Sequence, residues 1–411
     1  MRNWGGNHTY GAAQMHRPES LDDLRRTVAR APRIRVLGTR HAFTDIADSA
    51  ELVTLDALPV DVSVDRSAGT VSCGGAMTYG ALAKVLERER LALRNLPSLP
   101  HIAVGGSIAT ATHGSGDANG NLATAVAGLE LVTSSGDVVT GRRGDHDFEG
   151  LVVGLGATGA VTRVTLDAEP AYDVAQHVYE DLSWDALFEH FDAVFASGDS
   201  VSLFTRWGDA IDQAWVKRRV AGGPADAPAD LFGARHATSE RHPIAGMDAV
   251  NCTPQLGRPG PWWDRLPHFR MGFTPSAGAE IQSEYHLPRR HALAAIEALR
   301  ALAGAIAPLL YVSEIRTIAA DGLWMSPHYK RDSVALHFTW HPGQPAVERV
   351  LESVEAALEP FAPRPHWGKL FLADAGTIRA RYERLDDFAA LLQRLDERGA
   401  FRNAWLERHV I

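Results

Sequence analysis

The sequence predicts an α+β protein with two domains. The chain has 411 residues, which corresponds to about 2.7 domains of 150 residues. Hydrophobic residues make up 45% of the chain and charged residues 22%, as is typical of globular domains. Strand patterns and helix patterns follow one another irregularly, and the composition changes near residues 169–172. We therefore expect a first domain at 1–170 and a second that begins at 171.

The first domain is predicted to begin with a helix and a strand. Ser20 and Asp23 have the spacing of a capping box that opens a helix. A short strand over 33–37 then leads into the loop GTRHAF at 38–43. Further short strands are expected at 53–55, 60–64 and 70–73, and a helix at 79–90. An irregular, glycine-rich stretch covers 93–121, and the turn SSGD at 134–137 predicts a hairpin of 129–133 with 138–140.

The second domain is predicted to contain longer strands and helices. We expect helices at 184–195, 288–307 and 345–358. Strands are expected at 201–205, 213–216, 280–285, 313–317 and 334–340. A stretch rich in Pro, Gly and Ala at 221–261 is expected to form a loop.

Charge and cysteine content argue against several classes of function. The formal net charge is −9, which is not the footprint of a nucleic-acid-binding protein. Two cysteines, Cys73 and Cys252, provide neither a disulfide framework nor a thiolate metal site. Glu297 and Arg300 interrupt the most apolar run, at 292–312, so we expect a buried helix there and no membrane association. No stretch near the start resembles a signal peptide, so we expect a cytoplasmic protein, and we expect a monomer.

A dinucleotide motif is present but lacks its structural context. GLGATG at 154–159 matches GxGxxG, whose last glycine should open a helix that faces a pyrophosphate. The residues that follow, AVTRVTL at 160–166, are β-branched and alternate as a strand does. We therefore interpret this motif as a tight turn before a strand, with backbone close to a flat ligand, rather than as an NAD site.

Two loops with little side-chain bulk are candidate cofactor sites. The loop 38–43 leaves a strand with free backbone N–H groups, which can bind an anion. The second loop, GGSIATATHGSG at 105–116, has small residues at nearly every position. Such a stretch lets the backbone approach a ligand closely.

These loops and several further motifs resemble the vanillyl-alcohol-oxidase-type flavoproteins, most closely the bacterial alditol oxidases. The resemblance extends over nearly the whole chain. The motifs that carry it are NWGGN at 3–7, LPSLPHI at 96–102, ATHGSG at 111–116, SEIRT at 313–317, HFTW at 337–340 and PHWGK at 365–369. It implies an FAD-binding domain at 1–170, a mixed-sheet substrate domain at 171–370, and a segment 371–411 that returns to the first domain.

The resemblance also implies the cofactor and its ligands. FAD would be joined covalently to His41, and the 38–43 loop would wrap its pyrophosphate. Two positions depart from the usual loop pattern Gly-Ser-Gly-His-Ser, since Arg40 replaces a glycine and Ala42 replaces a serine. The remaining residues that the resemblance places against FAD are Gly38, Thr39, Ser98, Ala103, Gly106, Thr110, Thr112, His113, Gly114, Gly159 and Val161.

Alternation along the predicted strands brings polar side chains onto shared faces. Residues two apart in a strand point to the same side, so Glu314 shares a face with Arg316 and His337 with Thr339. Gln282 and Glu284 do the same on their strand, and Lys369 ends the PHWGK motif. Such a surface suits an uncharged polyol, because each hydroxyl both donates and accepts hydrogen bonds.

The resemblance assigns these residues to substrate binding and catalysis. It places Ser98, Gln282, Glu314, Arg316, His337, Thr339 and Lys369 against the substrate. His337 and Lys369 are the candidate bases, which the sequence does not distinguish, and Arg316 could stabilise developing negative charge. The implied activity is oxidation of a terminal hydroxyl of an alditol such as xylitol or sorbitol, with O2 reduced to H2O2.

Other functions remain open at this point. An aldonolactone oxidase or dehydrogenase would share the architecture. A non-catalytic protein that binds a sugar or a flavin would bind a polyol without reducing the flavin. A Rossmann NAD enzyme would be colourless when purified.

Overall fold

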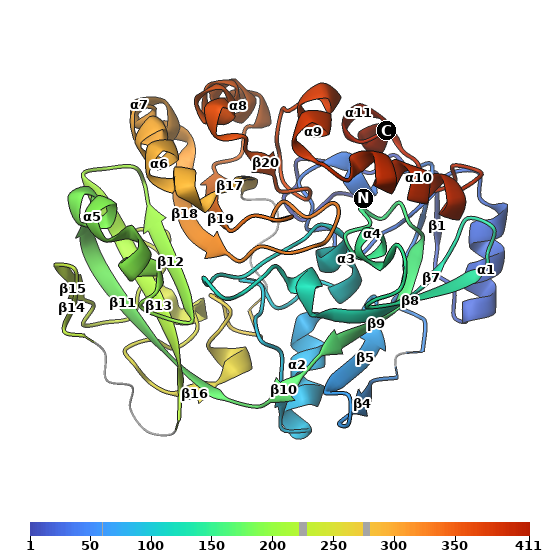
Figure 1. The fold of residues 1–411 in the computed structure, drawn as a ribbon, viewed down its shortest axis with the longest axis horizontal. Coiled ribbons are helices and arrows are strands. Elements are labelled where there is room, and N and C mark those ends of the chain that lie inside the picture. Colours follow the sequence, from blue (N-terminus) through green and yellow to red (C-terminus); the bar gives the residue numbers. More distant parts are fainter. Residues whose placement is uncertain (60, 222–227, 274–279) are drawn as a thin grey trace.

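A large antiparallel sheet forms the half of the molecule at the left of Figure 1. The computed structural model describes residues 1–59, 61–221, 228–273 and 280–411. Within them the strand order is β14-β15-β11-β13-β12-β18-β19-β17-β20, and β16 pairs with β11. The strands are β11 (Asp173–Ser183), β12 (Ser200–Thr205), β13 (Ala210–Val220), β14 (Asp230–Leu231), β15 (Ala234–His236), β16 (Gly260–Pro261), β17 (Ile281–Pro288), β18 (Leu310–Ile318), β19 (Ser333–Trp340) and β20 (Arg364–Pro365).

One face of this sheet is covered by helices, and the other faces the second half of the molecule. The covering helices are α5 (Trp184–Phe195), α6 (Ala292–Arg300), α7 (Ala303–Ile306) and α8 (Gln344–Leu358). Strand alternation sends Ile315, Phe338 and Trp340 into the apolar core, where they are fully buried. Their neighbours Glu314, His337 and Thr339 therefore point to the opposite face.

The other half contains two smaller sheets. Strands β4 (Ser63–Asp65), β5 (Thr70–Gly74), β9 (Ala160–Asp167), β7 (Val126–Val132) and β8 (Val138–Arg142) form an antiparallel sheet in that order. Strands β1 (Gln14–His16), β3 (Glu51–Val53) and β2 (Ile34–Val36) form a parallel one. The helices of this half are α1 (Leu21–Arg30), α2 (Tyr79–Arg88), α3 (Val104–Ala109) and α4 (Phe148–Val152), and β6 (Leu91–Ala92) pairs with β10 (Glu169–Pro170).

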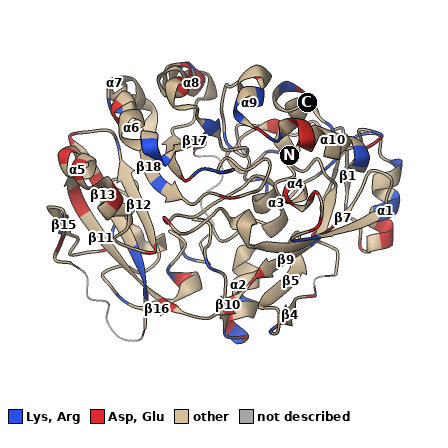
Figure 2. Ribbon diagram, viewed as in Figure 1, with Lys and Arg blue, Asp and Glu red and all other residues tan. Residues whose placement is uncertain are grey.

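The last helices of the chain pack on its first segments. Helix α10 (Leu385–Leu395) contacts α4, and α11 (Ala404–His409) contacts the 3-10 turn at Asp45–Ala47. The Asn403 side chain donates to three backbone carbonyls at 45–48. Figure 1 shows these helices and α9 (Ala375–Arg381) beside the blue N-terminal segment, and Figure 2 shows acidic and basic residues intermixed on the outer helices.

Most of the predicted elements form, including α2, the β7–β8 hairpin and β9 directly after the glycine turn. The predicted helix 288–307 is wrong as a single element, because it is broken between α6 and α7. Gly304 and Pro308, both poor residues for a helix interior, lie just beyond that break. Among the described residues no single helix is long and apolar enough to span a membrane. The pair 289–300 and 303–309 passes that test only jointly, across a 64° bend.

Several other elements differ from the predictions. Strand β11 was not predicted, since polar residues such as Gln176 and His177 interrupt its apolar pattern. Helix α3 lies inside the stretch predicted to be irregular, and β14, β15 and β16 lie inside the predicted loop 221–261. Residues 222–227 of that loop and Val60 of the predicted strand 60–64 lie outside the described residues.

Candidate active site

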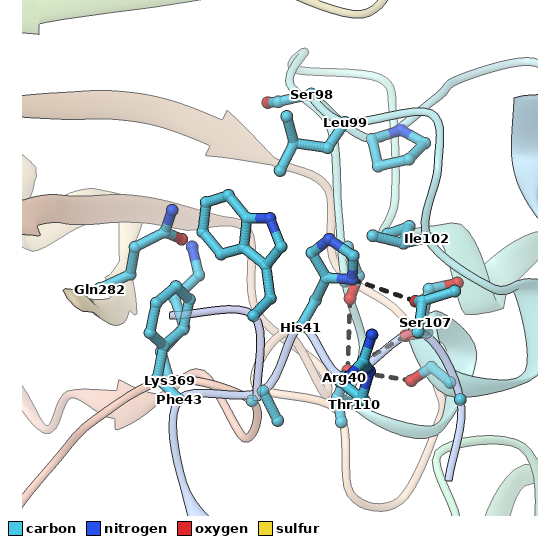
Figure 3. Close-up of a pocket in the computed structure, with 18 of the residues that line it drawn as sticks. Arg40, His41, Phe43, Ser98, Leu99, Ile102, Ser107, Thr110, Gln282 and Lys369 are labelled. Atoms are coloured by element: carbon cyan, nitrogen blue, oxygen red, sulfur yellow. Dashed lines mark hydrogen bonds between the residues drawn. The ribbon is translucent and has the colours of Figure 1, made fainter. Parts of the chain in front are cut away.

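A cavity of about 470 Å³ lies between the two halves of the molecule. Its walls come from the loop 38–43, from α3 and the residues around it, from the glycine turn before β9, and from β17, β18 and β19. Figure 3 shows His41 between Gln282 and Lys369 on one side and Ser107 and Thr110 on the other. The cavity thus joins the two predicted sites into one.

Nearly all residues predicted to contact FAD line this cavity. They are Gly38, Thr39, Arg40, His41, Ala42, Ser98, Ala103, Gly106, Thr110, Thr112, His113, Gly159 and Val161. Gly114 does not line it. A side chain at Gly114 would collide with the amide of Asn95, so this glycine permits close packing beside the cavity.

His41 is half-buried and uncharged. Its Nδ1 lies 3.1 Å from Thr39 Oγ1, and its ring stacks on Trp4 with centroids 5.4 Å apart. Burial, together with the neighbouring His101, lowers the pKa of His41 to about 3. Its Nε2 is buried and has no hydrogen-bond partner among the described residues. A neutral imidazole with an unpartnered ring nitrogen is suited to a covalent attachment.

The glycine turn before β9 is held by an arginine that the sequence analysis did not single out. Arg35 is almost fully buried and donates to the carbonyls of Leu155 at 2.6 Å and Gly156 at 2.8 Å. It also bonds the carbonyls of Ile46 and Phe401, so it ties the turn to the loop after β2 and to the C-terminal segment. In the sequence, the sign of this role is Arg35 itself, a basic residue within a short apolar strand.

The shape of the cavity fits a flavin dinucleotide. Gly105 packs on backbone, since a Cβ there would lie 2.8 Å from the Gly75 oxygen, whereas a Cβ at Gly106 would meet nothing within 4 Å. Gly106 thus opens on the empty part of the cavity. This open space, the small residues around it and the unpartnered His41 nitrogen match the demands of an extended, flat ligand. The residues that would hold FAD are those of the 38–43 loop, of α3 and of the turn before β9.

The register of three strands assembles the opposite wall. Glu284 on β17 is directly opposite His337 on β19, and His337 is opposite Glu314 on β18. In the next row Gln282 is opposite Thr339. All of these side chains and Arg316 line the cavity, as does Lys369 from the loop after β20.

Two cations and two anions on this wall compensate one another. Arg316 Nη2 donates to one oxygen of Glu284 at 2.6 Å, and Lys369 Nζ donates to the other at 2.7 Å. Arg316 Nε also lies 3.5 Å from Glu314. Burial raises the pKa of Glu284, but the charges of Lys369 and Arg316 outweigh it and hold that pKa well below its usual value. The four side chains of Glu284, Glu314, Arg316 and Lys369 together therefore carry no net charge.

His337 is a neutral base in this setting. Burial and the nearby charge of Lys369 hold its pKa well below 6.5. Its Nδ1 lies 3.8 Å from Glu314, and its Nε2 is buried without a hydrogen-bond partner in the described part of the chain. Burial also lowers the pKa of Lys369, although its pairing with Glu284 opposes this.

Some site residues could not be identified from the sequence. Strand alternation puts Glu284 on the same face as Gln282, but only the fold shows that Glu284 binds both Arg316 and Lys369. His268 and Phe204 also line the cavity, and His268 donates to Glu314. His113, Glu284 and His286 present ligand atoms within 4.8 Å of one another, but Glu284 is already neutralised by two cations, which disfavours a metal there.

Comparison with known proteins agrees with this geometry. Residues 12–142 match the family model of an FAD binding domain, and residues 278–409 match that of D-arabinono-1,4-lactone oxidase. An alditol oxidase of Streptomyces sp. is 49% identical over 98% of this chain and 97% of its own. An L-gulono-1,4-lactone dehydrogenase of Mycobacterium tuberculosis is 28% identical over 99% and 98%.

The fold has counterparts among solved structures. The crystal structure of cholesterol oxidase from Brevibacterium sterolicum superposes with a TM-score of 0.79 at 17% identity, over 100% of this chain and 96% of that one. That likeness shows the two-domain flavoprotein fold. The identity to the Streptomyces relative extends over almost the full length of both chains and shows the family as well as the fold. This chain belongs to the alditol oxidase family of FAD-dependent flavoproteins.

Proposed function

We propose that this protein oxidises a terminal primary hydroxyl of an alditol, such as xylitol or sorbitol, to the aldose and passes the electrons to O2. The observation that carries the proposal is the wall of Glu284, Arg316, Glu314 and Lys369, which is charged but balanced. Such a wall offers donors and acceptors to hydroxyl groups without attracting an anion or a cation. Family membership supports the same activity.

The residues of this wall have distinct roles in the proposed reaction. Glu314 and Thr339 orient hydroxyl groups, and Ser98 and Gln282 bind the remainder of the polyol. The unpartnered Nε2 of His337 accepts the hydroxyl proton, and Arg316 stabilises the developing alkoxide. Lys369 is the alternative base, in its deprotonated form. Bound FAD supplies the acceptor for the hydride and the route of its electrons to O2, with release of H2O2.

Anaerobic mixing with substrate tests the proposal directly. Xylitol or sorbitol should bleach the flavin absorbance near 450 nm, and admitted O2 should restore it with formation of an equal amount of H2O2. His337→Ala or Lys369→Ala should slow the bleaching if that residue is the base. A variant that keeps the wild-type rate constant would remove the role from its residue, and a flavin that alditols leave oxidised would overturn the function.

A lactone substrate is the second candidate, because residues 278–409 match the D-arabinono-1,4-lactone oxidase model. Both candidates are distinguished in the same experiment by mixing the enzyme with L-gulono-1,4-lactone. Faster bleaching by the lactone than by xylitol would favour this alternative. Reduction of artificial electron acceptors without O2 consumption would indicate a dehydrogenase.

We infer that FAD is attached covalently to His41. The neutral imidazole with its buried, unpartnered Nε2 and its position on the cavity wall support this inference. Acid precipitation should leave the yellow colour in the protein pellet, and His41→Ala should release it into the supernatant. Free flavin from the wild-type protein would overturn the covalent link while leaving the oxidase activity to be tested separately.

We also infer a monomer built from an FAD-binding domain at 1–170, a substrate domain at 171–370 and a returning segment at 371–411. The contacts of α10 and α11 with α4 and the turn at 45–47 support the return of the last segment. Light scattering during gel filtration should give a mass near 44.5 kDa. A mass of twice this value would contradict the monomer.

A further inference from the structure

A buried lysine lies beside the substrate wall, on the same face of the sheet and on the strand next to β12. Lys217 on β13 is only 1% exposed. Its Nζ lies 2.5 Å from the Leu266 oxygen, 3.1 Å from the Pro267 oxygen and 3.3 Å from His268 Nδ1. Lys217 does not line the main cavity, and the reaction proposed above does not use it.

The three partners of Lys217 match the three N–H groups of an ammonium ion. Two are carbonyl oxygens, which can only accept. If the third hydrogen goes to His268 Nδ1, that nitrogen must be unprotonated, and the proton of the neutral imidazole lies on Nε2. His268 Nε2 is 2.9 Å from Glu314 Oε1 and donates to it. Burial and the Lys217 charge lower the pKa of His268 to about 4, so the ring is neutral.

We propose that Lys217 is a positioning residue for substrate binding, which acts through His268 to orient the Glu314 carboxylate toward the hydroxyl groups of the substrate. The proposal rests on the function proposed above for its substrate, but the hydrogen-bond chain itself does not. Lys217 touches neither substrate nor cofactor site. Its effect is to select which nitrogen of His268 carries the proton.

Loss of one proton from Lys217 would break this arrangement. A neutral amine has two N–H groups, which the two carbonyl oxygens occupy, and a lone pair that then faces His268 Nδ1. The third bond is then reversed, with Nδ1 donating to the lone pair of the amine. Reversal leaves an unprotonated Nε2 facing the Glu314 carboxylate, and these two acceptors repel each other. Glu314 would then lose its fixed orientation.

The surroundings of Lys217 make this proton loss accessible near neutral pH. Burial lowers the pKa of Lys217 to about 7, against the opposing effects of Glu314 and Cys252. A polar cavity of about 100 Å³ is lined by Lys217 together with Arg94, Asp199 and Arg219. This cavity offers a route for the proton. Because a base loses its charge above its pKa, polyol binding should weaken as the pH rises through about 7.

Steady-state kinetics of the holoenzyme test the proposal with Lys217→Met, an uncharged variant of similar length. The KM for xylitol at pH 6 should rise 10- to 100-fold, as expected for loss of a hydrogen bond to a charged group. The kcat should change much less, and the rise of KM with pH that is expected for the wild type should be absent. Lys217→Arg should retain a low KM at pH 8, because the guanidinium stays charged. Lys330→Met, which removes an exposed lysine, is the matched control and should behave as wild type.

Histidine NMR gives a readout that does not depend on turnover. In ¹⁵N-histidine-labelled protein, the His268 ring, assigned with His268→Gln, should show the Nε2–H form at pH 6. In the wild type, the His268 ring should lose the Nε2–H form at pH 8.5. The Nδ1–H form at pH 6, or a xylitol KM that stays constant in the wild type from pH 6 to pH 9, would overturn the proposal even if Lys217→Met does not fold. Failure of alditols to reduce the flavin would instead contradict the proposed function and leave the NMR result standing.

Discussion

At the scale of single residues, Arg40 shows how the cofactor loop departs from its relatives. Its backbone φ is +64°, in the left-handed region that favours glycine. Its carbonyl accepts from the Trp4 amide at 2.7 Å, which holds the loop in this conformation. The glycine in the usual family pattern thus has a conformational reason, and this chain accepts backbone strain to carry an arginine on the cavity wall.

We expect Arg40→Gly to stabilise the protein relative to Arg40→Ala by about 1 kcal/mol, because alanine keeps the left-handed strain and glycine does not. Thermal unfolding of the two variants measures this difference. Both lack the arginine side chain, so its loss cancels in the comparison. Equal unfolding midpoints would show that the loop relaxes without cost.

At the scale of elements, the strands that carry the substrate wall could be predicted almost completely. Val, Ile, Phe and Trp alternate with polar residues in β18 and β19, and a period of two assigns each residue to a face. What this pattern cannot predict is the register between strands. The row Glu284, His337 and Glu314 depends on pairing between segments far apart in the chain, which no local pattern contains.

Helix α3 illustrates the opposite case, since its glycines conceal it from sequence analysis. Glycine disfavours helices, and the segment was accordingly predicted to be irregular. The surroundings of the two glycines explain their presence in this helix. Gly105 packs closely against the Gly75 backbone, and Gly106 opens on the cavity. The prediction that these residues approach a cofactor agrees with that geometry.

The two neighbouring glycines of α3 should therefore respond differently to alanine. Gly105→Ala should destabilise the protein by about 2 kcal/mol, because its Cβ would press on backbone that cannot move easily. Gly106→Ala should fold normally but retain less flavin, since its Cβ would occupy the proposed cofactor space. Unfolding midpoints and the flavin-to-protein absorbance ratio separate the two effects. Full flavin content in Gly106→Ala would place the cofactor elsewhere.

At the scale of the whole molecule, a buried histidine cluster joins the two halves. His113 follows α3, whereas His286, His328 and His366 come from the half with the large sheet. Their rings lie 4.5 to 6.0 Å apart between centroids. Burial holds the pKa of His286 and of His328 well below 6.5, and all ring nitrogens of these two lack hydrogen-bond partners among the described residues.

This cluster should make the protein sensitive to acid. Below about pH 6.5 the unfolded chain binds protons that the buried rings do not, so stability falls as the pH falls. Each such histidine contributes about 1.4 kcal/mol of lost stability at pH 5.5. His328→Leu should therefore lower the difference in unfolding midpoint between pH 7.5 and pH 5.5. The exposed His146→Leu control should leave it unchanged. An unchanged difference in His328→Leu would show that this ring binds protons in the folded protein as readily as in the unfolded chain.

The sequence by itself determined the type of most long elements, the polar face of each substrate-wall strand and, through its motifs, the flavoprotein family. These properties depend on periodicity and on short contiguous motifs, which a single chain displays. Only the tertiary structure decided that Glu284 pairs with both Arg316 and Lys369, that Arg35 holds the glycine turn, and that Lys217 reaches Glu314 through His268. Each of these depends on distances between segments far apart in the chain, and burial of the paired charges then determines which groups stay charged.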